Sequence, residues 1–364
     1  MDRSKWEYCP FEDCIEKSKK TKQLMTSDYQ NEGAYPIISQ EASLISGYTD
    51  DHDYVNHFNR PVVIFGDHTR ALKYVDFDFA VGADGVKILV PHAKLDAKFL
   101  LGFLTWYKIP NLGYSRHYKL LKEISVPVPP IEDQQRIVAE LDCLNEMIAV
   151  KQEQLKEFDK LAQSIFYDMF GDLSINNKGW QKKPFTEIAV AKTGITYKPD
   201  NVKDSGIIVL RSSNVQEDAL AFEDVVRIDL PISEKYYVQN GDILMCSRNG
   251  SARLVGKTAR IMNVNEIMTW GAFMTIIRSQ YNDFLFHYFK TDTFRDSLAS
   301  SKTTTVHQIT IGMLNALNIP LPTLTLQQQF AEKISAIEAQ KKLVKQSIAE
   351  TQHLLDYTMD KYFG

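Results

Sequence analysis

The sequence predicts an α+β protein in which two mostly β or mixed globular domains are separated by a long antiparallel two-helix coiled coil, with an internal pseudo-twofold duplication. The first observation is a repeat, because a shift of 193 positions places Pro127 on Pro320 and Gly171 on Gly364 without a gap. The second is the spacing of apolar residues inside both copies of this repeat. The third is a series of short apolar and β-branched runs before each copy, which is typical of strands.

Apolar residues in both copies follow steps of four and three, the seam of a two-helix coiled coil. The seam residues are Ile137, Leu141, Leu144, Ile148, Leu155 and Phe158 in the first copy and Phe330, Ile334, Ile337, Val344, Ile348 and Leu355 in the second. Lys151 interrupts the first seam, and Lys341, Thr351 and Thr358 weaken the second. A Pro-x-Pro start and a glycine stop predict helices of about 36 residues, about 54 Å long. A core hairpin of a larger helical bundle is the alternative, which the non-helical middle segments disfavour.

The duplication extends to whole halves. Trp6 is followed by Pro10-Phe11, and Trp180 by Pro184-Phe185. The duplication predicts two domains and two spacer helices. Domain 1 is expected at 1–126, helix 1 at 127–171, domain 2 at 172–319 and helix 2 at 320–364.

Each domain is expected to contain short strands and one helix. The expected strands are 35–38, 62–65 and 86–90 in the first domain and 207–210, 243–246 and 274–277 in the second. Helices are expected at 96–107 and 282–300 from their apolar spacing. Because the ends of a domain usually lie near each other, the second helix should return antiparallel along the first.

The composition limits which partners and which cellular compartment are expected. The chain has 364 residues and a formal net charge of -4, so any surface for nucleic acid must be local. Its four cysteines show no Cys-x-x-Cys pair, which favours reduced thiols in the cytoplasm. Neither a signal peptide nor a membrane span is expected, and therefore no membrane partner.

Motifs for catalysis are weak. The segment 250–258 looks like a phosphate loop but has five residues between its glycines where the motif has four. The eight histidines are scattered, so no metal site and no catalytic residue is expected. A nuclease or nucleotide hydrolase that uses the near-miss loop is one alternative function.

Local positive charge with polar neighbours is the stronger signal. Arg and Lys can anchor phosphates or bond guanine, while Asn, Ser and Thr read base edges. The candidate DNA-binding residues are His68, Thr69, Arg70, Lys73, Tyr114, Ser115, Arg116 and His117 in the first half and Lys198, Arg211, Arg248, Asn249, Ser251, Arg253, Lys257, Arg260, Lys302, Thr304 and His307 in the second. Solvated basic loops are the alternative interpretation. Two globules held at a fixed separation suit a regular polymer such as double-stranded DNA, whose half-sites share one face when their centres lie about 34 Å apart.

The two Pro-x-Pro segments, each followed by Gln-Gln and a long amphipathic helix ending in Phe-Gly, resemble those of the DNA-specificity subunit of type I restriction-modification enzymes. The most specific part is 126–138, supported by Gly241-Asp242-Ile243-Leu244 and the Gly256-Lys257 turn. The resemblance implies that 1–126 and 172–319 are target-recognition domains, one per half-site of a split sequence, and that the helices are the conserved spacer.

By the same resemblance the chain is not an enzyme and holds no cofactor. Two DNA-methyltransferase (modification) subunits would dock on the helices and recruit restriction and motor subunits, and these partners would use S-adenosylmethionine, ATP and Mg. A coiled-coil protein-binding scaffold and the specificity chain of a methylation-only or single-chain nuclease system stay open as alternatives.

Overall fold

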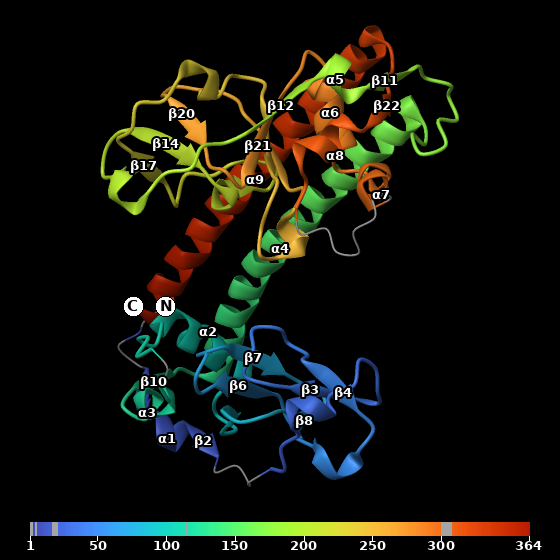
Figure 1. Ribbon diagram of the computed structural model, residues 1–364. Coiled ribbons are helices and arrows are strands. Elements are labelled where there is room, and N and C mark those ends of the chain that lie inside the picture. Colours follow the sequence, from blue (N-terminus) through green and yellow to red (C-terminus); the bar gives the residue numbers. More distant parts are fainter. Residues whose placement is uncertain (1–2, 4–5, 17–20, 114, 300–307) are drawn as a thin grey trace. The chain divides into compact units, whose positions relative to one another are not determined.

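A computed structural model describes residues 3, 6–16, 21–113, 115–299 and 308–364. The chain forms two compact units, Met1–Gln154 with Leu343–Gly364 and Leu155–Lys342 (Figure 1). Each unit combines small β-sheets with helices, so the chain is α+β as the sequence predicts. Among the described residues, none of the helices has both the length and the apolar character needed to cross a membrane.

The first unit contains two four-stranded sheets. The sheet β2-β9-β6-β7 is antiparallel throughout and consists of Ile15–Glu16, Val86–Pro91, Val62–Gly66 and Leu72–Val75. The sheet β4-β3-β8-β5 has a parallel central pair, β3 with β8, and consists of Gly47–Thr49, Tyr35–Ile38, Phe79–Val81 and Val55–Asn56. The remaining elements are β1 (Glu7–Pro10) paired with β10 (Ser125–Val128), and the helices α1 (Phe11–Cys14), α2 (Ala97–Tyr107) and α3 (Tyr118–Leu121).

The second unit repeats this plan. Its antiparallel sheet β12-β21-β18-β19 consists of Val190–Thr193, Met274–Arg278, Ile243–Cys246 and Thr258–Arg260. Its second sheet, β13-β17-β14-β20, again has a parallel pair, β14 with β20, and consists of Val202–Lys203, Val226–Ile228, Ile207–Leu210 and Met268–Trp270. The remaining elements are β11 (Lys182–Pro184) paired with β22 (Asn318–Pro320), the hairpin β15 (Val215–Gln216) and β16 (Ala219–Leu220), and the helices α5 (Phe185–Ile188), α6 (Asn282–Tyr288), α7 (Asp292–Ala299) and α8 (Ile311–Asn315).

The predicted strands agree closely with these bounds, since each predicted strand starts at the first residue of a strand in the structure. Short 3-10 turns connect several of them: Thr26–Asp28, His52–Tyr54, Pro199–Asn201, Ser212–Asn214, Glu234–Tyr236 and Ala252–Leu254. The helix expected at 96–107 is α2, because Asp96 caps it by accepting from the backbone N–H of Lys98 and Phe99.

The prediction of a single helix at 282–300 was wrong, because α6 ends at Tyr288 and α7 begins at Asp292. Thr291 explains the break. Its hydroxyl donates to the carbonyl of Tyr288 and accepts from the N–H of Phe294, so one side chain ends the first helix and caps the second.

The two long helices, α4 (Ile131–Phe170) and α9 (Leu324–Phe363), confirm the predicted pair of long helices and have 40 residues each, more than the predicted length of about 36. They run antiparallel in both units. In the first unit, Lys151 contacts Thr351 and the Tyr362 hydroxyl donates to Glu140. In the second, Lys341 pairs with Asp159 at 2.8 Å, and the rings of Phe166 and Phe330 lie 5.7 Å apart.

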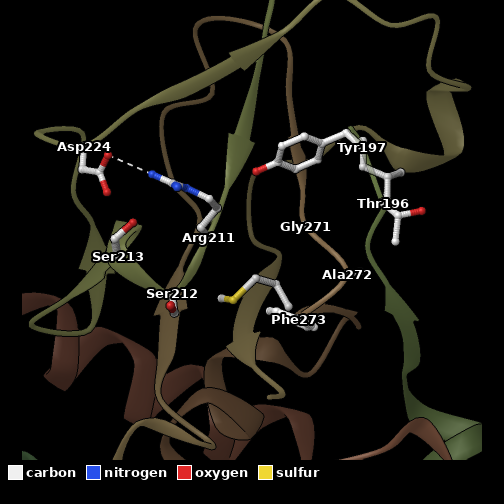
Figure 2. Close-up of a pocket in the computed structure, with 11 residues that line it drawn as sticks. Thr196, Tyr197, Arg211, Ser212, Ser213, Asp224, Gly271, Ala272 and Phe273 are labelled. Carbon is white, nitrogen blue, oxygen red and sulfur yellow. Dashed lines mark ion pairs between the residues drawn. The ribbon is translucent and has the colours of Figure 1, made fainter. Parts of the chain in front are cut away.

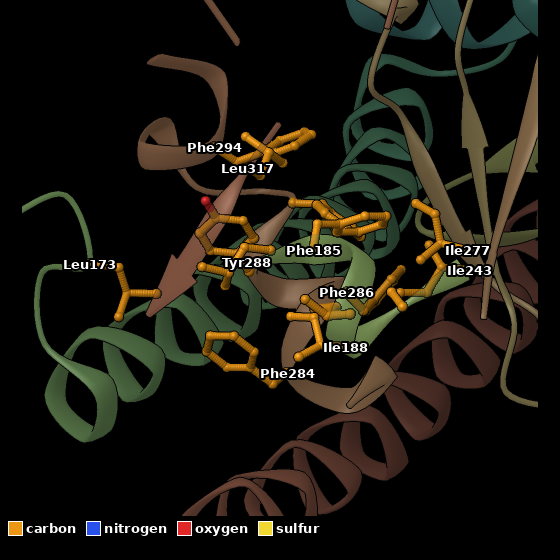
Figure 3. Close-up of a cluster of buried hydrophobic side chains, with 14 of the residues drawn as sticks. Leu173, Phe185, Ile188, Ile243, Ile277, Phe284, Phe286, Tyr288, Phe294 and Leu317 are labelled. Carbon is orange, nitrogen blue, oxygen red and sulfur yellow. The ribbon is translucent and has the colours of Figure 1, made fainter. Parts of the chain in front are cut away.

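Most of the predicted seam residues are buried, and the rest are half-buried. The buried members are Ile137, Leu141, Leu144, Phe330, Ile334, Ile337 and Leu355, and the half-buried ones are Ile148, Leu155, Phe158, Val344 and Ile348. In the second unit they join an aromatic core around Phe185, Phe284 and Tyr288 (Figure 3). Helix and domain therefore share one core within that unit.

Candidate nucleic-acid interface

In the second unit, three loops meet at the carboxyl end of the parallel pair β14 and β20. One loop follows β14 at 211–214, one follows β18 at 247–257, and one precedes β21 at 271–273. The N–H groups of Ser247 and Arg248 both donate to the carbonyl of Phe273, at 2.9 and 3.1 Å. The Asn249 amide donates to the Ser212 hydroxyl at 3.3 Å. Hydrogen bonds thus hold the three loops together as one edge.

A pocket of about 620 Å³ opens beside this edge, and Figure 2 shows its lining. Its walls combine the aromatic rings of Tyr197 and Phe273 with the hydroxyls of Ser212 and Ser213 and the guanidinium of Arg211. Arg211 pairs with Asp224 at 2.8 Å. Aromatic faces together with hydrogen-bonding groups are the combination that nucleic-acid bases require.

Arg248 is the most available cation at this edge. Its guanidinium lies 5.5 Å from the centroid of the Phe273 ring, and Phe273 is 60% exposed. Such a cation–π contact contributes about 0.5–1 kcal/mol at an exposed site and fixes the orientation of the guanidinium. Among the residues the structure describes, no carboxylate lies within ion-pair distance of Arg248. It can therefore meet an anion or a base without breaking an ion pair.

The neighbouring polar residues are oriented as well. The Asn249 side-chain oxygen accepts from the N–H of Ser251 at 3.0 Å, which leaves the amide pointing to Ser212. Ser251 and Arg253 are exposed on the same loop, and Lys257 donates to the Gln216 side chain at 3.2 Å.

Two further cations of the second half, Arg260 and Lys198, are placed differently. Arg260 lies on β19, only 22% exposed, and pairs with Asp283 at 2.7 Å, so it belongs to the fold. Lys198 is exposed in the loop before Pro199. Lys302, Thr304 and His307 lie outside the described residues.

The first unit forms the equivalent edge from the three loops that follow β3, β6 and β8. The side-chain oxygen of Gln40 accepts from the N–H of His68 at 3.2 Å, and the Thr69 hydroxyl donates to the Gln40 carbonyl. Gly85 has a φ of 95°, and a Cβ there would lie 2.6 Å from the Gln40 side-chain oxygen and 3.0 Å from the His68 ring. Only glycine fits at this close approach.

Three more predicted residues lie near this first edge. Arg116 is exposed and pairs with Asp84 at 3.3 Å. Arg70 is held by a hydrogen bond from its guanidinium to the carbonyl of Ile109 at 3.1 Å, and Ser115 is half-buried. Tyr114 lies outside the described residues.

Two predicted contacts are corrected, because the structure buries them. Lys73 is 6% exposed, and its ammonium donates to the carbonyl of Ser39 at 2.8 Å. Burial lowers the pKa of Lys73, as expected for an ammonium removed from water. It lies on the edge strand β7, opposite Ile64 of β6, and its side chain is buried against the Ser39 carbonyl.

His117 is fully buried, and both ring nitrogens are used within the unit. Its Nε2 accepts from the N–H of Leu112 at 3.1 Å, so Nδ1 carries the proton and donates to the carbonyl of Asp67 at 2.9 Å. The N–H of His117 donates to the Asp67 carbonyl as that of Ile309 donates to Ser247 in the second unit. His117 thus occupies a core position.

Sequence reasoning missed the partners that complete each edge, namely Gln40, Tyr197, Ser212, Asp224 and Phe273. The available signal was position, because Gln40 and Ser212 follow a strand closely and Phe273 lies in the short connection between β20 and β21.

The near-miss phosphate loop does not have the structure of one. Residues 252–254 form a single 3-10 turn and the segment continues into strand β19, whereas a phosphate loop leads into a helix whose N-terminus binds the anion. Within the described ranges, no group of three His, Cys, Asp or Glu residues could hold a metal ion.

Comparison with known proteins gives one consistent result. The family described as "Type I restriction modification DNA specificity domain" matches residues 3–158 and 177–353. The EcoKI specificity subunit of Escherichia coli (strain K12) is 26% identical over 172 residues, which cover 45% of this chain and 37% of that protein. The StySPI specificity subunit of Salmonella potsdam is 25% identical over 187 residues, 49% of this chain and 40% of that protein.

The matched region thus spans about two fifths of the length of these two relatives. The MjaVIII specificity subunit of Methanocaldococcus jannaschii matches over more of its length, at 22% identity over 92% of this chain and 86% of that protein. A solved S subunit of a type I restriction-modification system from M. genitalium has a TM-score of 0.55 and 15% identity, covering 99% of this chain and 96% of its own. That likeness concerns the fold.

Proposed function

The chain belongs to the family of type I restriction modification DNA specificity domains, and from this premise we propose that it is a specificity subunit that recognises a bipartite DNA sequence. Each unit would read one half-site. The observation that carries the proposal is the repeated edge, at which three loops meet at the carboxyl end of a parallel strand pair in both units. We assign residues 1–126 and 172–319 to the two target-recognition domains and 127–171 and 320–364 to the spacer helices.

In the second unit, Arg248 and Asn249 would read bases directly. An arginine bonds O6 and N7 of guanine, and an asparagine bonds N6 and N7 of adenine. Both side chains are pre-oriented, Arg248 by the Phe273 ring and Asn249 by Ser251. Arg253, Lys257 and Lys198 would contact phosphates, since they are exposed or half-buried and sit on loops.

In the first unit, His68, Thr69 and Arg116 would face the duplex, with Gln40 as an additional reader. Their chemistry differs from that of the second edge, which supports two unrelated half-sites. The whole chain has a formal net charge of -4, so tight binding would require partner subunits that add positive charge around the duplex.

The partners we propose are two DNA-methyltransferase subunits, docked on α4 and α9, and through them restriction and motor subunits. They would act in the cytoplasm, and S-adenosylmethionine, ATP and Mg would be bound by these partners. Exposed apolar residues on the helices of the first unit support a docking surface, because such residues cluster where proteins bind. They are Met147, Val150, Leu343, Leu354 and Tyr357.

The test is a map of methylated adenines in the genome of a host that carries the chain and its methyltransferase partner, compared with the same host lacking the chain. A split motif with a constant gap, present only when the chain is present, is the expected result. A map identical in both hosts would reject the proposal and favour a protein-binding scaffold. A split motif without any cleavage of unmodified DNA would indicate a methylation-only system.

A further inference from the structure

The polar residues that interrupt the two helical seams have a role beyond holding the helices together. We propose that Lys151 and Lys341 determine the register in which α9 lies along α4. The DNA consequence rests on the proposed function, because the register of the spacer helices would set the gap between the half-sites.

In the first unit, Lys151 of α4 contacts two residues of α9. Its ammonium donates to the Thr351 hydroxyl at 2.7 Å and approaches the Ser347 carbonyl at 3.4 Å. The Thr351 hydroxyl itself donates to the Ser347 carbonyl at 2.7 Å, so its oxygen is oriented to accept from the lysine. Thr351 is 7% exposed, and the contact is shielded from solvent on that side.

In the second unit, Lys341 makes the corresponding contact from the other helix. Its ammonium pairs with Asp159 on α4 at 2.8 Å and with Glu338 on its own helix at 3.0 Å, and its side chain is 12% exposed. Burial alone would lower the pKa of Lys341, but its hydrogen bonds to the two carboxylates outweigh burial and raise it. Lys341 therefore stays charged and requires a polar partner across the seam.

An apolar seam alone discriminates poorly between registers, because its residues recur every seven positions. A slip of one heptad moves one helix along the other by about 10 Å and still places apolar residues opposite one another. The lysines break this equivalence. A slip in one direction puts Lys151 opposite Val344, seven residues before Thr351, in the first unit.

A slip in the opposite direction puts Lys341 opposite Phe166, seven residues after Asp159, in the second unit. Phe166 is 1% exposed and offers no acceptor. An ammonium buried against an apolar side chain loses its hydration without compensation. Each lysine thus excludes one direction of slip, and the pair excludes both. A polar residue at a seam position is known to specify register at a cost in stability.

The test is the double variant Lys151→Leu/Lys341→Leu of the full chain. The matched control is Lys156→Leu/Lys342→Leu, which makes the same change at exposed positions of the same helices. Spin labels at Met147 on α4 and Tyr357 on α9, both exposed, report the register by electron–electron distance. The background carries serine at the exposed Cys143 and half-buried Cys9 so that they do not take up label.

We expect one distance in the unsubstituted chain and in the control, and a second distance in the double variant, whose melting temperature is unchanged or raised. The swap Lys151→Thr/Thr351→Lys restores the cross-helix contact and should restore the single distance in the first unit. One distance in the double variant would overturn the inference, and so would a double variant that melts lower or fails to fold, because the lysines would then serve stability.

The distance measurement needs no DNA, so it separates this inference from the proposed function. If the register inference and the proposed function are both correct, the map of methylated adenines for the double variant shows the split motif with more than one gap length. A map without a split motif in the unsubstituted chain would reject the DNA role and leave the register result standing.

Discussion

Replacing Arg248 by alanine is the most direct test of the second edge. The side chain is exposed, it contacts the Phe273 ring, and among the described residues it has no carboxylate partner that its loss would leave unpaired. We therefore expect the free energy of unfolding to fall by no more than about 1 kcal/mol, the contribution of the lost cation–π contact. A direct base contact contributes about 1–3 kcal/mol of discrimination, so affinity for the specific duplex should fall about 5- to 150-fold.

Arg260→Ala is the matched control from the same basic segment. Arg260 is 22% exposed and bound to Asp283, so its loss should lower the free energy of unfolding by up to about 1 kcal/mol and leave DNA affinity unchanged. Two arginines 12 positions apart in the sequence (248 and 260) are thus expected to differ in their effect on DNA affinity.

The assay is fluorescence anisotropy of the complex with the proposed methyltransferase subunits, on a duplex carrying the mapped motif and on one with the second half-site altered. For Arg248→Ala we expect lost preference between the duplexes with the salt dependence retained, because a base contact releases no counterion. Loss of a phosphate contact would instead reduce the slope of log affinity against log salt by about 0.9. Unchanged affinity in Arg248→Ala, or a greater loss in Arg260→Ala, would refute the assignment.

Three other changes have expected outcomes. Asp224→Asn should strengthen binding to duplex DNA in the same anisotropy assay, because it removes a negative charge from the pocket and releases Arg211 from an ion pair. His287 has its pKa lowered to about 3 by burial and by nearby cations, so the folded state holds it neutral while the unfolded chain binds a proton below its ordinary pKa of 6.5. Stability should therefore fall as pH drops below 6.5, by up to about 1.4 kcal/mol per pH unit, and urea titrations should show a shallower fall in His287→Gln. Phe330→Ala should lower the free energy of unfolding by about 3–5 kcal/mol in a urea titration, because Phe330 is fully buried, whereas Leu324→Ala, at a 48% exposed position, should not.

The long helices could be predicted from sequence because their signal is local and repeated. Each seam recurs over many turns, and the Pro-x-Pro segment 127–129 and Gly171 bracket α4 without reference to the rest of the fold. The strands were found for a similar reason, since apolar runs bounded by turn residues indicate strands on their own.

The site was harder to predict because its residues come together only through the fold. Gln40 and His68 lie 28 positions apart, and Asn249 and Ser212 lie 37 apart, yet each pair is joined by a hydrogen bond. A charge pattern read along the sequence cannot distinguish Lys73, which is buried on strand β7, from Arg248, which is exposed on a loop. Strand register decides between them, and register depends on partner strands.

The duplication is also consistent with the proposal that one scaffold reads two unrelated half-sites. The backbone bonds are equivalent, since the N–H of Gly82 donates to Ile38 as that of Gly271 donates to Leu210, and the N–H of Asp67 donates to Gly85 as that of Ser247 donates to Phe273. The side chains of the loop residues beside these bonds are not equivalent. At equivalent positions the first edge carries serine, glutamine and histidine (39, 40 and 68), and the second carries arginine, serine and arginine (211, 212 and 248).

Because the equivalent backbone bonds position the loops, their side chains can change without loss of the fold. An edge with two arginines favours guanine, whereas glutamine pairs with adenine. Different half-sites are therefore what this arrangement should produce from a single duplicated fold.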